Sequence, residues 1–162
     1  MAAAHEPGHV ADTASLRIAA PPEVLYDLVA DVTQMGRLSP ECTGGRWLGR
    51  AKGPAVGARF VGFNRRGWVR WATTNTVVEA ERPRVFAFET KQSGARWRYT
   101  FEPDGDGTIV TETREEWRER PLSARFAARF FLGGVEEHDD EMRAGLQATL
   151  ERLKALAESR DL

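Results

Sequence analysis

The stretch that decides the fold is RWRYTFE, from Arg96 to Glu102. Its aromatic residues Trp97, Tyr99 and Phe101 alternate with polar ones, which is the period of a β-strand with one apolar face. An Asp-Gly-Asp-Gly sequence follows at 104–107 and predicts a tight turn into a further strand. The stretch therefore predicts an antiparallel hairpin within a larger sheet.

The same period of two extends outward over residues 42–117 and occurs once more near the N-terminus. Short links join these segments, and short links favour antiparallel neighbours in a sheet. The sequence predicts about seven strands, at 12–19, 44–50, 57–64, 68–79, 85–90, 96–102 and 108–117.

Helical spacing is found before and after this region. Pro21, Pro22 and Glu23 are typical of a helix start, and apolar residues follow them at helical spacing. A second, shorter helical piece ends at Pro40. From Val135 onward an apolar stripe predicts a long C-terminal helix, with Met142, Leu146, Leu150, Leu153 and Ala157 as its members. We therefore expect an α+β helix-grip fold: a curved antiparallel sheet of about seven strands wrapped around the long helix, with two short helices after the first strand.

Length and composition favour one globular domain. The chain has 162 residues, of which 41% are hydrophobic and 29% charged, enough for one core. We expect a flexible tail at 1–11, one domain at 12–158 and a short tail at 159–162. The net charge of −1 gives no general attraction to nucleic acid or to an anionic membrane surface.

Several kinds of site are not indicated by the sequence. The single cysteine, Cys42, cannot form an intrachain disulfide, and the paired Cys and His spacings of metal sites are missing. Nucleotide-binding glycine loops and the nucleophile elbow are missing as well, so we expect no cofactor and no metal. The N-terminal residues lack the basic start and apolar run of a signal peptide, and no apolar run is long enough to cross a membrane, so we expect a cytoplasmic protein without a membrane span.

Six stretches, in this order and spacing, resemble one known family. They are AAPPEVLYDLVAD (19–31), GPAVGARF (53–60), NRRG (64–67), WATT (71–74), VVEAERPR (77–84) and LERLKAL (150–156). Together with the order of elements they resemble the START-like (Bet v 1-like, or SRPBCC) superfamily, in its bacterial polyketide cyclase/dehydrase and lipid-transport branch. The resemblance covers residues 12–158. It implies a helix-grip fold around a cavity, and a small hydrophobic molecule such as a lipid or polyketide as the ligand.

Strand parity and this resemblance together identify candidate cavity residues. Apolar walls with a few polar groups are typical of small-molecule sites. The alternative is a solid aromatic core, in which the threonines are ordinary strand residues. The predicted ligand-binding residues are Phe60, Trp71, Thr73, Asn75, Phe86, Phe88, Trp97, Tyr99 and Met142.

No complete set of catalytic groups is evident, and only His138 and Asn75 are weak candidates. His138 lies four residues before Met142 and suits acid–base chemistry near neutral pH. It also lies in an acidic run, which favours a solvated surface position. The charged residues from Glu112 to Arg120 could contain a carboxylate pair, but an exposed strand end with cross-strand ion pairs is the favoured interpretation.

Three functions remain open from the sequence. The favoured one is binding, and possible transport, of a small hydrophobic ligand in the cavity. The alternative is a polyketide cyclase/dehydrase-type enzyme that needs no cofactor and guides its ligand by shape and a few polar groups. A third is a non-catalytic dimerisation or regulatory module, in which Phe126, Phe130 and Phe131 would form a homodimer surface.

Overall fold

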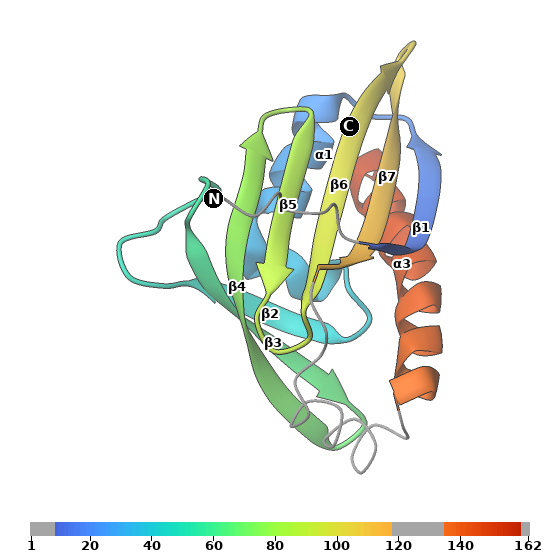
Figure 1. Ribbon diagram of the computed structural model, residues 1–162. Coiled ribbons are helices and arrows are strands. Elements are labelled where there is room, and N and C mark those ends of the chain that lie inside the picture. Colours follow the sequence, from blue (N-terminus) through green and yellow to red (C-terminus); the bar gives the residue numbers. More distant parts are fainter. Residues whose placement is uncertain (1–8, 118–134, 160–162) are drawn as a thin grey trace.

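The structure is a computed structural model, which describes residues 9–117 and 135–159. Its centre is an antiparallel sheet of seven strands in the order β1-β7-β6-β5-β4-β3-β2 (Figure 1). From β2 to β7 each strand pairs with its neighbour in the chain, as the short links predict. The strands are β1 (His9–Ile18), β2 (Cys42–Trp47), β3 (Arg59–Arg66), β4 (Val69–Glu81), β5 (Val85–Thr90), β6 (Ala95–Asp104) and β7 (Gly107–Glu116).

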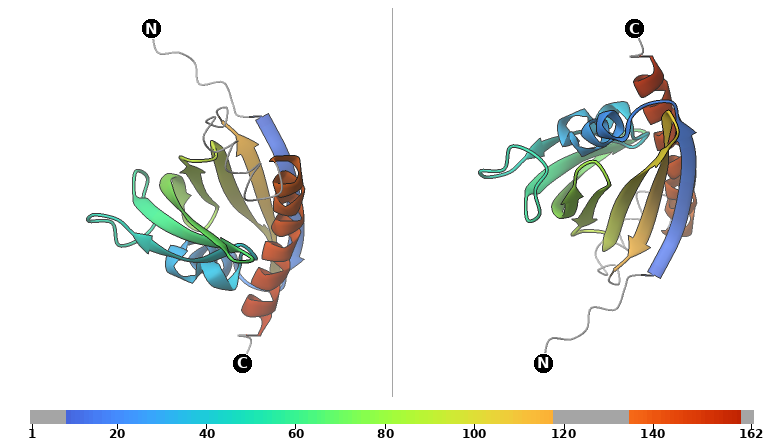
Figure 2. Two further views of the ribbon diagram at one scale, coloured as in Figure 1. Left: turned by 90° about the horizontal axis from the view of Figure 1, so that it is seen from below. Right: turned by 90° about the horizontal axis from the view of Figure 1, so that it is seen from above.

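In the described part of the chain, three helices accompany the sheet. α1 (Pro22–Ala30) begins with proline in its first turn, and the short piece after it is a 3₁₀ helix, η1 (Val32–Arg37). The Asp31 side chain accepts a hydrogen bond from the Thr33 backbone N–H and caps η1. The long helix α3 (Val135–Glu158) packs on β1 and β7 (Figure 2). The α+β helix-grip prediction is confirmed.

The core lies between the concave face of the sheet and these helices. Its side chains come from alternate strand positions and from one stripe of α3, where Leu146, Leu150, Leu153 and Ala157 are buried as predicted. Tyr26 of α1 packs edge-on against Phe86 and Phe101, with ring centroids 6.2 and 5.7 Å away. Full burial of each large side chain contributes about 1.5–3 kcal/mol to folding.

Glycine allows η1 to lie close to β2. A Cβ atom at Gly45 would lie 2.6 Å from the carbonyl oxygen of Val32, which is too close for any larger residue. This close approach brings Met35 and Leu38 over the inner face of the sheet, where both line a cavity.

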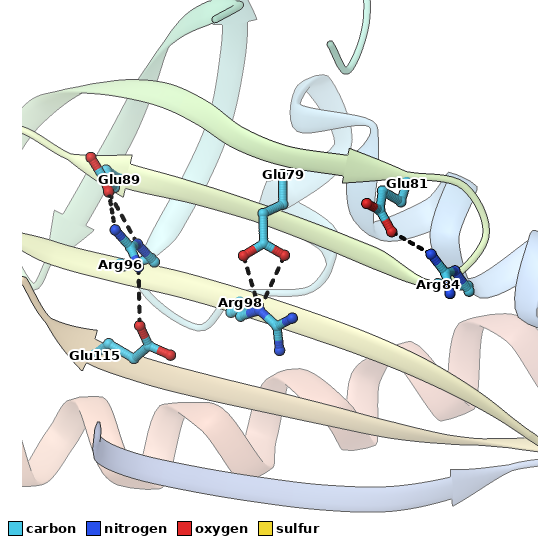
Figure 3. Close-up of polar contacts among 7 residues, drawn as sticks. All are labelled: Glu79, Glu81, Arg84, Glu89, Arg96, Arg98 and Glu115. Atoms are coloured by element: carbon cyan, nitrogen blue, oxygen red, sulfur yellow. Dashed lines mark hydrogen bonds and ion pairs between the residues drawn. The ribbon is translucent and has the colours of Figure 1, made fainter. Parts of the chain in front are cut away.

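The convex face of the sheet is covered by ion pairs between neighbouring strands (Figure 3). Arg96 on β6 pairs with Glu89 on β5 at 2.6 Å and with Glu115 on β7 at 3.5 Å. Arg98 pairs with Glu79 on β4 at 3.2 Å. Of the run Glu112–Arg120, for which cross-strand ion pairs were predicted, Glu115 takes part in these pairs through Arg96. Within the described residues, no helix has the length and apolar character to cross a membrane.

Candidate functional site

A cavity of about 470 Å³ lies between the concave face of the sheet and the helices. Its walls come from strands β2 to β7, from α1, η1 and the link after η1, and from α3 at Gly145 and Thr149. Most of the lining surface is apolar or aromatic, and polar side chains are interspersed in it, of which Glu41, Arg65, Arg66 and Glu112 are the ionisable carboxyl and guanidinium groups. This volume is within the range of small-molecule sites in proteins.

Seven of the nine predicted ligand-binding residues line this cavity: Phe60, Trp71, Thr73, Asn75, Phe88, Trp97 and Tyr99. Phe86 does not, although it shares the face of Phe88. It is fully buried, because α1 covers this part of β5 and places the Tyr26 ring against it. The Met142 and His138 side chains lie outside the described part of the structure, so their predicted roles stay predictions. The predicted homodimer surface is outside it as well, at Phe126, Phe130 and Phe131.

The aromatic wall is held by ring contacts. The Phe60 ring lies edge-on to Phe88, with centroids 5.1 Å apart, and to Trp47 at 5.6 Å. Rings packed in this way gain about 0.5–1.5 kcal/mol beyond their buried area, which keeps the wall ordered.

One polar group in the wall is the pair Asn75 and Thr90. The two residues are opposite one another on β4 and β5, and both are buried. The Thr90 hydroxyl donates to Asn75 Oδ1 at 2.7 Å, and Asn75 Nδ2 donates to the Thr73 hydroxyl at 3.2 Å. The amide is thereby oriented from two neighbouring side chains, as a preorganised polar contact requires.

The second polar group is the pair Tyr99 and Glu112, opposite one another on β6 and β7. The Tyr99 hydroxyl donates to Glu112 Oε1 at 2.6 Å. Glu112 is only 2% exposed, and its other oxygen, Oε2, has no hydrogen-bond partner among the described residues. Burial raises the pKa of Glu112 to about 8, although the bond from Tyr99 acts in the opposite direction. The carboxyl group is therefore mostly protonated and uncharged at neutral pH.

This position of Glu112 corrects the sequence interpretation. The prediction that the charged residues from Glu112 onward form an exposed strand end is wrong for Glu112 and Arg114, which are 2% and 3% exposed. The two residues share a face of β7, as their parity indicated, but it is the inner face. The signal that could have found this was the tight turn at Gly105 and Asp106, because its register places Tyr99 opposite Glu112.

Arg114 has a structural role at the edge of the cavity region. Its guanidinium pairs with Asp12 of β1 at 2.6 Å, and Arg143 of α3 pairs with the other oxygen of Asp12 at 2.6 Å. The side chains of Arg114 and Asp12 are 3% and 7% exposed, so the pair is shielded from water. It joins β7, β1 and α3.

Cys42 is a further ionisable group of the cavity wall whose pKa is raised. Its thiol donates to the Gly44 carbonyl oxygen at 3.3 Å, and burial raises the thiol pKa. A thiol with a raised pKa is a poor nucleophile at neutral pH, so Cys42 is better explained as a packed residue of the wall. Across residues 9–117 and 135–159, no three His, Cys, Asp or Glu side chains form a group that could hold a metal ion.

Comparisons with known proteins agree with this architecture. The NMR structure of the Polyketide_cyc-like protein Cgl2372 from Corynebacterium glutamicum is 33% identical, with a TM-score of 0.60 over 90% of both chains. A Thermus thermophilus crystal structure, TTHA0849, is 17% identical, with a TM-score of 0.64 over 93% of this chain and 99% of that one. The comparison with curated proteins gives no match.

The fold also occurs in a larger protein. The di-domain ARO/CYC StfQ, from the steffimycin biosynthetic pathway, matches with a TM-score of 0.69 and 16% identity. The match covers 91% of this chain and 50% of StfQ, and at this identity it shows the fold alone. A family model described as "Polyketide cyclase / dehydrase and lipid transport" matches residues 10–158. The chain belongs to this polyketide cyclase/dehydrase and lipid-transport family.

Proposed function

We propose that the protein binds a small, mostly apolar molecule in the cavity. The observation that carries this proposal is the composition of the buried part of the wall: aromatic rings lie beside two preorganised polar pairs, and the buried carboxyl of Glu112 is mostly uncharged at neutral pH, whereas Glu41, Arg65 and Arg66 line the cavity as partly or fully exposed side chains. Such a wall favours an apolar ligand with one or two hydrogen-bonding groups, such as a carbonyl or hydroxyl. The family description, which includes lipid transport, supports the same class of ligand.

A cavity-filling variant tests this proposal. Thr73→Phe would place a ring inside the cavity, whereas Thr76→Phe, on the same strand, points to the opposite face, where Thr76 lies between Arg59 and Glu89. The protein is purified under non-denaturing conditions and analysed by native mass spectrometry, and it is then titrated with a polarity-sensitive dye and a panel of lipids. We expect the wild type and Thr76→Phe to retain a ligand or bind the dye, and Thr73→Phe to lose most of this binding. Equal binding by all three proteins, or none by the wild type, would contradict the proposal.

Proton transfer on the bound molecule is the second candidate, and Glu112 is the observation that favours it. A buried carboxyl with a pKa of about 8 can hold a proton at neutral pH and release it to a ligand. This chemistry would suit a cyclase/dehydrase-type reaction: the ionised minority form of Glu112 would take a proton from a carbon next to a carbonyl, and the protonated form so produced would return that proton at another position of the same molecule. Asn75 would then hold the carbonyl oxygen.

Isotope exchange separates catalysis from binding. The ligand captured by the protein is incubated in deuterium oxide with the wild type or with Glu112→Gln, and its mass is followed. A catalytic Glu112 predicts deuterium uptake with the wild type and little with Glu112→Gln, while both proteins retain the ligand. If the wild type leaves the mass unchanged, this second candidate is wrong and binding stands alone.

A further inference from the structure

The charges of the chain are distributed unevenly along the sequence. Residues 42–78 contain seven basic side chains and no acidic one, although the whole chain has a net charge of −1. This segment forms β2, β3 and most of β4. A basic segment in a chain that is otherwise acidic indicates an interaction with an anionic partner more strongly than the net charge does.

Arg65 and Arg70 are the centre of this segment. They lie directly opposite one another on β3 and β4, next to the turn, and both are exposed. Within the described residues neither forms an ion pair, and the only hydrogen bond of the Arg65 side chain runs from Nε to the Gly67 carbonyl oxygen at 2.7 Å. Like charges in directly opposite positions destabilise a sheet. The arrangement therefore costs stability unless an anion lies between the two guanidinium groups.

The turn of this hairpin presents an aromatic side chain to solvent. Gly67 has a φ of +61°, which permits a two-residue turn, and Trp68 beside it is 86% exposed. Phe63, two residues before Arg65 on the same face, is 43% exposed. Figure 1 shows the β3–β4 hairpin extending beyond the ends of β5 and β6. The molecule thus has a protruding tip with an exposed indole and, among the described residues, two arginines without an ion pair behind it.

A hollow of about 480 Å³ lies beside these arginines on the hairpin. It adjoins the aromatic cavity, with which it shares Asn64, Arg65 and Trp71, and its lining from β2, β3 and β4 is part apolar and part polar. The residues that form it are Thr43, Phe63, Asn64, Arg65, Arg70, Trp71 and Ala72. A phosphate group held there would be within reach of the arginine pair, which is the chemistry that guanidinium groups recognise best.

We propose that the β3–β4 hairpin docks the protein on an anionic phospholipid surface. Trp68 enters the boundary between headgroups and acyl chains, where indole rings are enriched, and Arg65 and Arg70 bind lipid phosphates. A stable contact with a folded protein needs about 800 Å² of complementary surface on each side, whereas a narrow projecting tip suits a surface that it can penetrate. Arg66 and Gly67 of the same hairpin also line the aromatic cavity, so docking would bring the cavity to the bilayer. That last consequence rests on the proposed function, and the docking does not.

Flotation with vesicles tests the docking. Vesicles of phosphatidylcholine are compared with vesicles that also contain phosphatidylglycerol, at low and high salt. We expect the protein to float only with the anionic vesicles and to be released by salt.

Arg70→Gln should weaken vesicle binding roughly fivefold, the effect of one arginine near an anionic surface. Trp68→Ala should weaken it roughly tenfold through lost apolar burial. The matched control is Arg59→Gln, which removes the same charge at the far end of β3 and should have a smaller effect.

A second measurement places the indole in the bilayer. Brominated lipids quench tryptophan fluorescence only from within the membrane, so we expect quenching in the wild type and its loss in Trp68→Phe.

No binding to anionic vesicles, or equal binding by Trp68→Ala, Arg70→Gln and the wild type, would overturn the proposal. Hairpin-dependent binding to single-stranded RNA or to an acidic protein, without vesicle binding, would overturn it too. The dye titration is run on the same wild-type protein: dye binding without vesicle binding contradicts the docking alone, and vesicle binding without dye binding contradicts the cavity function alone. In Trp68→Ala we expect dye binding to be retained while vesicle binding is lost.

Discussion

Two glutamates on β7 have different surroundings on the two faces of this sheet, and they therefore differ in the partners available to their carboxyl groups. Glu115, on the convex face, pairs with Arg96 and remains partly open to water. This pair belongs to the row of cross-strand ion pairs among Glu79, Arg98, Glu89, Arg96 and Glu115 in Figure 3, which we call the ladder. Glu112, three residues earlier and on the concave face, is buried against the Tyr99 hydroxyl, and burial raises its pKa to about 8. The convex face offers an opposite charge for each carboxylate in the ladder. The concave face offers a neutral hydroxyl, so the carboxyl there is retained at a cost in stability, as is typical of functional groups.

The largest expected effect is the pH dependence of stability that Glu112, the concave glutamate, should cause. The pKa of Glu112 is higher in the folded chain than its ordinary value of 4.5, so the folded state keeps this proton while the unfolded state loses it. The free energy of unfolding should therefore fall as the pH rises from about 4.5 to about 8, by roughly 3–5 kcal/mol in total. Glu112→Gln should remove this fall and be the more stable protein at pH 8.

Urea denaturation across this pH range measures the effect as the difference between the wild type and each variant. Glu115→Gln is the matched control, and its free energy of unfolding should fall with pH as steeply as that of the wild type. Parallel curves for the wild type and Glu112→Gln would show that Glu112 is ionised in the folded protein, and the contrast between the two faces would disappear.

Buried and half-buried ion pairs sharpen the comparison. Arg114→Met would leave the buried Asp12 with Arg143 alone, and we expect a loss of about 3 kcal/mol in the free energy of unfolding. Arg143→Met removes a side chain that is 58% exposed and should cost less than about 1 kcal/mol. Chemical denaturation of both variants at pH 7 provides the numbers. Similar losses would mean that burial does not distinguish these two partners of Asp12.

On the convex face, the ladder itself should contribute less. Arg96 is 16% exposed and contacts both Glu89 and Glu115, so Arg96→Met should cost about 1 kcal/mol, and high salt should reduce the difference from the wild type. Denaturation at two salt concentrations checks both statements. A loss as large as that expected for Arg114→Met would show that the outer ladder is as important as the buried pair.

Features set by local periodicity could be predicted from the sequence, whereas features set by the twist of the sheet and by helix packing could not. Alternation of aromatic residues identified Trp97 and Tyr99, and both line the cavity. β7 has apolar or β-branched residues on both faces, such as Ile109 and Val110, so its parity alone could not show which face is buried. Phe86 had the right parity, yet α1 covers it, and no local pattern reports the position of a helix packed from elsewhere in the chain.

The smallest expected effect belongs to the pair at the turn between β4 and β5, where the convex face meets water. Arg84 and Glu81, drawn in Figure 3, form an ion pair of 2.6 Å, yet their side chains are 73% and 62% exposed. Water and salt screen such a pair, and ordering two long side chains costs entropy, so Arg84→Gln should change the free energy of unfolding by less than about 0.5 kcal/mol. Urea denaturation beside Arg96→Met measures both variants on one scale. A change above about 1 kcal/mol for Arg84→Gln would mean that proximity, rather than burial, sets the strength of ion pairs on this sheet.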